Sequence, residues 1–183
     1  VVARTTKDII TACGSKYCPT SVGAALQEIG AGEGRFAVVG LPCQIHGIRK
    51  LEKADRAFRR KLALHFGLFC ANNNTFLGTE YFLMRHGVAP ENVTQIRYRA
   101  KGWPGWIVVP LRDGTTREFR RGSTETSLRR RRLFSSAFHY DFMIPRCLLC
   151  PDLTSELADI SFGDPWNREF LGSETIGKSM LIA

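Results

Sequence analysis

Four of the six cysteines in the 183-residue sequence have a placement that suggests shared chemistry. Cys147 and Cys150 form a Cys-x-x-Cys pair, which can chelate one metal centre by itself, and Cys43 and Cys70 each follow a short apolar segment. Four thiolates are the ligand set of an iron–sulfur cluster. They are also a ligand set of structural zinc, which usually takes two Cys-x-x-Cys pairs. The remaining alternatives are a redox dithiol and unligated buried thiols, and the latter would be improbable for all four cysteines.

The elements around these cysteines predict an α/β fold. Apolar segments at 35–39 and 61–69 are typical of strands, with Leu62, Leu64, Phe66 and Leu68 alternating in the second. Helical spacing of apolar residues predicts helices at 22–29, 45–58 and 76–86. Successive strand–loop–helix units indicate parallel strands. The carboxyl ends of parallel strands meet at one edge of a sheet, so we expect Cys43 and Cys70 to lie side by side.

The middle of the chain has a different pattern, which predicts an antiparallel excursion. Strands are expected at 93–99, 105–111 and 115–119, with an Asp113-Gly114 hairpin turn before the last of them. The remaining predictions are a short strand entering a helix at 1–11, a loop at 13–20, an Arg-rich helix at 127–142, an irregular cysteine loop at 144–152 and a strand at 158–162. The predicted fold class is therefore α/β, with a mixed, partly parallel sheet flanked by helices and with irregular loops carrying the cysteines.

Composition and charge narrow the class of protein. Hydrophobic residues make up 44% and charged residues 23% of the chain, as in ordinary soluble domains, and this excludes a disordered protein. No apolar run approaches the ~20 residues that a membrane span requires. The net charge of +9 is concentrated at Arg117, Arg120, Arg121 and residues 129–132. This region could be a solvated basic face or could bind an acidic partner or a polyanionic cofactor tail. A nucleic-acid partner is not expected, because no nucleic-acid-binding motif accompanies the charge.

The ends of the sequence suggest a segment of a longer polypeptide. There is no initiator Met, and the last residues form an apolar run, Met180-Leu181-Ile182-Ala183. We expect residues 1–183 to be a single domain, the central part of a longer protein whose N- and C-terminal portions are missing. No signal peptide is visible, so the expected location is the cytoplasm.

Six motifs in register resemble one family across nearly the whole chain. They are Cys13-Gly14-Ser15-Lys16-Tyr17, Val39-Gly40-Leu41-Pro42-Cys43-Gln44-Ile45, Gly67-Leu68-Phe69-Cys70, Lys101-Gly102-Trp103-Pro104-Gly105, Arg146-Cys147-Leu148-Leu149-Cys150-Pro151-Asp152 and Ala158-Asp159-Ile160-Ser161-Phe162-Gly163-Asp164-Pro165-Trp166. The sequence is similar to the coenzyme F420 hydrogenase/dehydrogenase beta-subunit family. The resemblance implies an iron–sulfur flavoprotein oxidoreductase that passes electrons between a [4Fe–4S] cluster and FAD, with hydride exchange to coenzyme F420 or a related acceptor.

The resemblance also implies roles for particular residues. The cluster ligands would be Cys43, Cys70, Cys147 and Cys150. The residues expected to contact FAD are Ser15, Lys16, Tyr17, Gly40, Leu41, Pro42, Gln44 and Trp103. No side chain is assigned as a general acid or base. The implied partners are a redox subunit or a ferredoxin. If F420 is the substrate, the basic residues at 117–132 would bind its acidic oligoglutamyl tail.

A rival hypothesis comes from a different class of protein. The four cysteines would hold zinc in a non-catalytic module, and the basic region would bind nucleic acid or a partner protein.

Cys13 and Cys18 have a Cys-x4-Cys spacing that we interpret as incidental. His46 and His65 are interpreted as hydrogen-bonded structural histidines rather than proton carriers.

Overall fold

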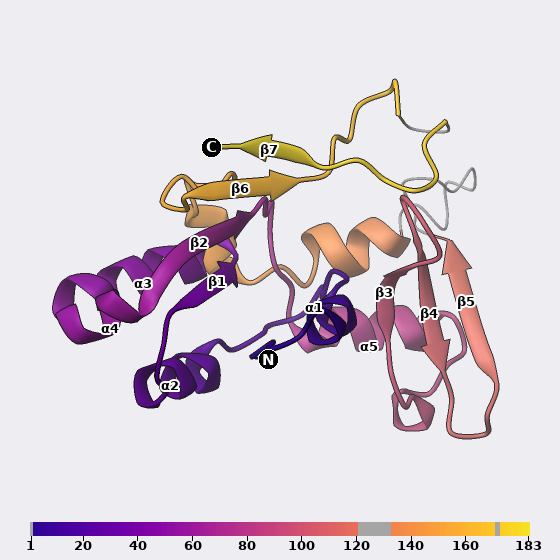
Figure 1. The fold of residues 1–183 in the computed structure, drawn as a ribbon. Helices are drawn as coiled ribbons and strands as arrows, with labels where there is room; N and C mark the ends of the chain where they lie inside the picture. Colours follow the sequence, from indigo (N-terminus) through magenta and orange to yellow (C-terminus); the bar gives the residue numbers. More distant parts are fainter. Residues whose placement is uncertain (1, 121–132, 171–172) are drawn as a thin grey trace.

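Two sheets joined by helices make up the fold (Figure 1). The computed structural model describes residues 2–120, 133–170 and 173–183. One sheet has the order β1-β2-β6-β7 and the other is the meander β3-β4-β5. Their strands are β1 (Phe36–Gly40), β2 (Leu62–Leu68), β3 (Arg97–Ala100), β4 (Trp106–Pro110), β5 (Thr116–Arg120), β6 (Ile160–Gly163) and β7 (Met180–Ile182). β1, β2 and β6 are parallel and β7 is antiparallel to β6, so the predicted mixed sheet is confirmed.

Three helices cover one face of the first sheet. They are α2 (Gly23–Ala31), α3 (Pro42–Ala54) and α4 (Arg56–Lys61). Their apolar residues and those of β1 and β2 form one core, which consists of Ile29, Val38, Ile45, Ile48, Phe58 and Leu62. This core belongs to the strand–helix–strand unit that the apolar spacing predicted.

The predicted helix at 45–58 is wrong in its bounds, because Asp55 interrupts it. α3 begins three residues earlier, with Pro42 in its first turn, where the missing N–H costs no hydrogen bond. Asp55 has an extended backbone and its carboxylate accepts hydrogen bonds from Ala57 N at 2.8 Å and Phe58 N at 3.0 Å. The side chain therefore caps a new helix, α4, instead of continuing the first.

A β-bulge in β2 overturns the predicted alternation of its leucines. Phe36 pairs with Leu62, but the next residue of β1, Ala37, pairs with Leu64, so Ala63 is an extra residue. An inserted residue reverses the face on which the following side chains lie. Leu62 and His65 are consequently both buried beneath the helices, whereas Leu64 points to the opposite face.

The second sheet has a separate core, packed against α5 (Phe76–Arg85) and η2 (Ser136–Tyr140), a π-helical turn. The members of this core are Phe82, Leu83, Val88, Tyr98, Ile107, Val109, Phe134, Ala137 and Phe138. The Asp113-Gly114 turn is confirmed, with Gly114 at a φ of +83° and the Asp113 carboxylate accepting from Thr115 N at 2.9 Å. β3 is shorter than the predicted strand at 93–99, because the turn η1 (Pro90–Asn92) precedes it and Val93 makes only an isolated bridge to Leu111.

The N-terminal strand predicted within residues 1–11 is wrong for the described residues 2–11. Thr5 accepts a hydrogen bond from Asp8 N, and the Asp8 carboxylate accepts from Thr5 N. This reciprocal cap starts the helix α1 (Thr6–Ala12), so the helix predicted to follow the strand is confirmed.

Two further differences lie toward the C-terminal end. The strand β7 was not predicted, although its sequence is apolar, because its pairing with β6 depends on tertiary structure. The Arg-rich helix predicted at 127–142 lies partly outside the described residues, which show helix from 133 to 140.

Among the described helices, none is long and apolar enough to cross a membrane.

Candidate site at the carboxyl ends of the parallel strands

The four predicted ligand cysteines lie around the carboxyl end of the parallel sheet. Cys43 is in the first turn of α3, directly after β1, and Cys70 follows β2. Cys147 lies in η3 (Pro145–Leu149) and Cys150 follows it. Burial, and after it negative charge on Cys147, Cys43 and Cys150, raises the pKa of the Cys70 thiol to about 11. Because this repulsion decreases with distance, the four sulfurs form one group of neighbours.

Backbone hydrogen bonds fix the Cys70 loop against the Cys147–Cys150 loop. Cys70 N donates to Leu153 O at 3.0 Å, and Ile144 N donates to Asn73 O at 2.9 Å. Asn73 N also donates to Cys147 Sγ at 3.3 Å. This last contact joins the Cys147 side chain directly to the Cys70 loop.

The pair His46–Asp152 joins the Cys43 helix to the Cys150 loop. His46 Nε2 and Asp152 Oδ2 are 3.0 Å apart, and the Asp152 side chain is buried. Its other carboxylate oxygen accepts a hydrogen bond from Thr154 N at 3.0 Å. His46 is therefore a hydrogen-bonded structural histidine, as the sequence predicted.

His65 is at the centre of a second polar network beneath the cysteines. Its Nδ1 lies 3.1 Å from Asp159 Oδ2 and its backbone N donates to the same oxygen at 2.7 Å. Its Nε2 lies 3.2 Å from Glu52 Oε1, without the geometry of a hydrogen bond. Arg49, on α3, donates to Asp159 at 2.8 Å and to Leu157 O at 2.9 Å. The network thus joins α3, β2 and the segment before β6, which are three of the segments that position the cysteines.

Replacing Asp159 with alanine is expected to lower the free energy of unfolding by about 1–2 kcal/mol at neutral pH, because buried donors on His65 lose their acceptor. Burial raises the pKa of Asp159, but hydrogen bonds from His65 and Arg49 lower it by more, so it lies below its usual value. This stabilisation is present above the ordinary aspartate pKa of about 3.9 and is lost as the pH falls through the lowered value. Urea unfolding of both proteins at neutral and at acidic pH measures the difference. A difference that stayed constant down to about pH 2 would contradict this account.

The residues expected to contact FAD do not all lie at this edge. Gln44 joins the Gly40–Pro42 turn to the N-terminal loop, since its Oε1 accepts from Leu41 N at 2.9 Å and its Nε2 donates to Thr20 O at 3.1 Å. Lys16 Nζ donates to the carbonyl oxygens of Ala12 and Gly14, both at 2.8 Å, at the end of α1.

Tyr17 and Trp103 have packing partners on the protein itself. Tyr17 packs edge-on against Tyr98, with ring centroids 5.5 Å apart, and belongs to the margin of the second core. Trp103 is buried and its ring lies 5.0 Å from that of Trp166. Trp166 is 43% exposed and follows β6, so it is the accessible ring of this pair.

Sequence reasoning missed the Trp103–Trp166 stack, although both tryptophans belong to recognised motifs. Arg99 lies over the Trp166 ring at 5.5 Å and forms an ion pair with Asp164. The buried Trp103 Nε1 has no hydrogen-bond partner among the described residues. A polar atom in this condition is unusual, and a bound group could supply the missing acceptor.

The basic region is described only in part. Arg117 and Arg120 are exposed on β5, where Arg120 lies 5.5 Å from the centroid of the Trp106 ring. Arg121 and residues 129–132 lie outside the described residues.

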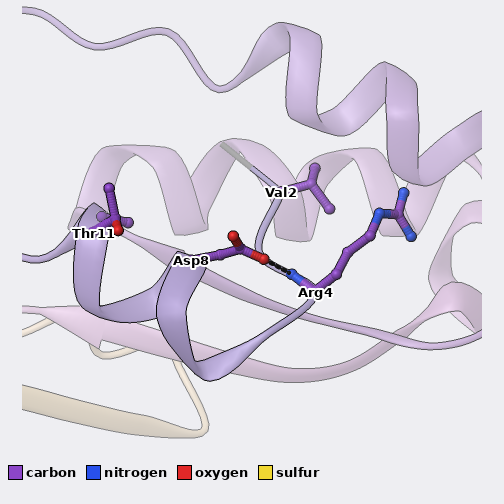
Figure 2. A pocket seen from close by; sticks show the side chains of 5 residues that line it. Val2, Arg4, Asp8 and Thr11 are labelled. Carbon is purple, nitrogen blue, oxygen red and sulfur yellow. Dashed lines mark hydrogen bonds between the residues drawn. The ribbon is translucent and has the colours of Figure 1, made fainter.

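Two observations bear on other kinds of site. In the part of the chain that the structure describes, no three His, Cys, Asp or Glu side chains are close enough together to hold a single metal ion. A pocket of about 240 Å³ lies beside α1 (Figure 2), and Val2, Arg4, Asp8, Thr11 and Ala12 line it. The carboxylate in this pocket, that of Asp8, already has a partner within the protein, since it accepts a hydrogen bond from Arg4 N at 2.9 Å. The pocket contains none of the candidate site residues.

Comparison with known proteins agrees with the motifs. Residues 33–183 match the family model that describes the C terminus of the beta subunit of coenzyme F420 hydrogenase/dehydrogenase. The chain belongs to this family. The coenzyme F420 hydrogenase/dehydrogenase beta subunits are oxidoreductase subunits, and the chain is similar to relatives from Methanococcus voltae and Methanosarcina mazei.

Three relatives show the range of proteins in which this region occurs. The chain is 27% identical to the coenzyme F420-dependent sulfite reductase of Methanocaldococcus jannaschii, over 89% of this chain and 25% of the relative. It is 26% identical to the coenzyme F420 hydrogenase subunit beta of Methanococcus voltae, over 94% of this chain and 58% of the relative. A chain of the F420-reducing [NiFe] hydrogenase complex from Methanosarcina barkeri has the same fold, with a TM-score of 0.61 and 25% identity over 90% of this chain and 52% of that chain. The chain therefore spans between a quarter and somewhat more than half the length of these relatives.

Proposed function

We propose that this chain is the cofactor-binding part of an F420-linked oxidoreductase, in which Cys43, Cys70, Cys147 and Cys150 hold a [4Fe–4S] cluster beside FAD. The observation that carries the proposal is the gathering of four thiols at the carboxyl edge of a parallel sheet, in a member of the coenzyme F420 hydrogenase/dehydrogenase family. Ligands of α/β sheets bind at this edge.

The donor set fits an iron–sulfur cluster. Negative charge on the other three cysteines opposes ionisation of Cys70 when no cation is present, and bound iron would remove that repulsion. Each thiolate of a [4Fe–4S] cluster binds a different iron atom, so its sulfurs lie farther apart than four sulfurs around one zinc ion, each about 2.3 Å from the metal.

The residues proposed to contact FAD would position the flavin relative to the cluster. The turn of Gly40, Leu41 and Pro42 adjoins Cys43, and Gln44 joins this turn to the loop of Ser15, Lys16 and Tyr17. Trp103 would support the accessible ring of Trp166 at the end of β6. A bound flavin supplies the exchange between a two-electron hydride and single electrons. The protein would contribute position, electrostatics and exclusion of water.

The proposed acceptor is coenzyme F420 or a related hydride carrier, since the named relatives act on or with F420. A redox subunit or a ferredoxin in the cytoplasm would exchange electrons with the cluster.

We expect replacement of the four arginines at 129–132 with glutamine to raise KM for F420 roughly tenfold and to leave flavin content unchanged. Each exposed ion pair with the acidic tail contributes at most about 1 kcal/mol. The matched control replaces Lys53, Arg56, Arg59 and Arg60, four exposed cations near the opposite edge of the sheet. Steady-state kinetics would measure both variants. An unchanged KM in the first variant, or an equal rise in the control, would contradict a role for this region.

The test of the proposed function is an anaerobic visible spectrum of the full-length protein, with iron, acid-labile sulfide, zinc and flavin quantified together. Four irons and one flavin per chain, followed by F420 reduction, would support the proposal. Zinc at one ion per chain without flavin would overturn it and would favour a non-catalytic zinc module.

A further inference from the structure

One face of the first sheet has no layer packed against it among the described residues. The helices in contact with β1 and β2 are α3 and α4, and they lie on the face that contains Val38 and His65. On the other face, Val39 is 60% exposed, Leu64 42% and Leu68 40% (the strands are labelled in Figure 1). The residues that share this bare face by their register are Ala37, Val39, Leu64, Phe66, Leu68, Ile160, Phe162 and Leu181.

The bare face has the apolar composition that is typical of a buried protein core. All eight residues are apolar, and they extend across all four strands from β1 to β7. Sheets of parallel strands are almost always covered on both faces. A contiguous apolar surface of this extent on a soluble protein marks a site of contact with another polypeptide.

The strand order explains why the described chain leaves this face open. The connections from β1 to β2 and from β2 to β6 step in the same direction across the sheet. Right-handed crossovers that step in one direction place their segments on one face. A second layer requires polypeptide outside this set of connections, as in a doubly wound sheet that extends past its first strand.

The relatives contain the polypeptide that such a layer would need. The matched region is 58% of the hydrogenase subunit beta from Methanococcus voltae and 52% of the solved hydrogenase chain. We propose that amphipathic helices of the same polypeptide, from outside residues 1–183, pack on the bare face and complete a three-layer sandwich. This inference concerns the fold and does not depend on which cofactors the protein binds.

Hydroxyl-radical footprinting of the full-length protein, read by mass spectrometry over a dilution series, tests the proposal. The probed residues are Leu64 and Leu181. The matched control is Leu77, a leucine on α5 that is 59% exposed. We expect the oxidation rates of Leu64 and Leu181 to be at least roughly fivefold lower than that of Leu77 at every concentration, since buried side chains are shielded from the radical.

Three results would overturn the proposal. Oxidation of Leu64 and Leu181 at the rate of Leu77 would mean that the face is open in the whole protein. Protection that disappears on dilution would identify a second copy as the occupant. Protection that appears only when a redox partner is added would assign the face to that partner.

Discussion

The variant Cys70→Ser is expected to contain almost no iron or acid-labile sulfide and to lack the broad visible absorption of a cluster. Cys70 is partly buried, and burial together with the neighbouring thiolates raises its pKa to about 11. A cluster with four cysteine ligands cannot exchange one thiolate for a serine hydroxyl at neutral pH without a large loss of affinity. Metal and sulfide analysis of protein purified without oxygen measures the effect. The variants Cys43→Ser, Cys147→Ser and Cys150→Ser should behave in the same way.

The control for this series is Cys13→Ser. Cys13 is exposed, and its thiol donates to Ile9 O within α1 rather than contacting the four-cysteine group. Its replacement should leave iron content unchanged, whereas Cys18 is a poorer control because it packs against the second core. Full iron content in all four ligand variants would refute the cluster assignment. An iron loss in Cys13→Ser equal to that in Cys70→Ser would show that the loss reflects general damage to the protein.

The variant Gly67→Ala is expected to lose about 3 kcal/mol or more of its free energy of unfolding. A Cβ at position 67 would lie 2.3 Å from Ser155 Cβ and 2.9 Å from Ala158 Cβ, closer than real atoms approach. Ser155 cannot easily move, because it is buried and its backbone O accepts a hydrogen bond from Ser161 Oγ at 3.1 Å. Overpacking of a rigid interior costs about 1–3 kcal/mol and occasionally more. Urea unfolding followed by circular dichroism measures the loss.

Gly47→Ala is the matched control. Gly47 lies in the middle of α3, and a Cβ there would meet no atom within 4 Å. Alanine is the better helix former, so this variant should gain up to about 1 kcal/mol. If both glycine variants were equally stable, the close approach of β2 to the Ser155 segment would be wrong. That approach also fixes the start of the Cys70 loop, so Gly67→Ala should reduce iron content as well.

The sequence predicted the arrangement of the candidate site better than its details. The apolar segments predicted at 35–39 and 61–69 were sufficient to place Cys43 and Cys70 at one edge of a parallel sheet, because strand direction follows from the connecting helices. The resemblance to the coenzyme F420 hydrogenase/dehydrogenase family supplied the same four cysteines.

Other features depended on information that one-dimensional patterns lack. The extra residue Ala63 has no distinctive side chain, and its effect is visible only in the pairing of β1 with β2. Asp55 is as compatible with a helix surface as with a cap, and only the local backbone decides between them. Tyr17 was expected beside a flavin because of its motif, but its described contacts are with aromatic residues of the second core, which come from positions 98, 134 and 138.

The order of the elements along the chain has a consequence for protein synthesis. β1, α3, α4 and β2 are consecutive and form most of the first core, so this unit can assemble soon after it leaves the ribosome. Cys43 and Cys70 are then present before Cys147 and Cys150 have been made, and β2 has not yet gained its neighbour β6, which pairs with Phe66 through Ile160. During that interval the edge of β2 and two reduced thiols are open to solvent. The cluster proposed above would therefore be inserted only after the second half has been translated, and until then the two early thiols would be open to oxidation.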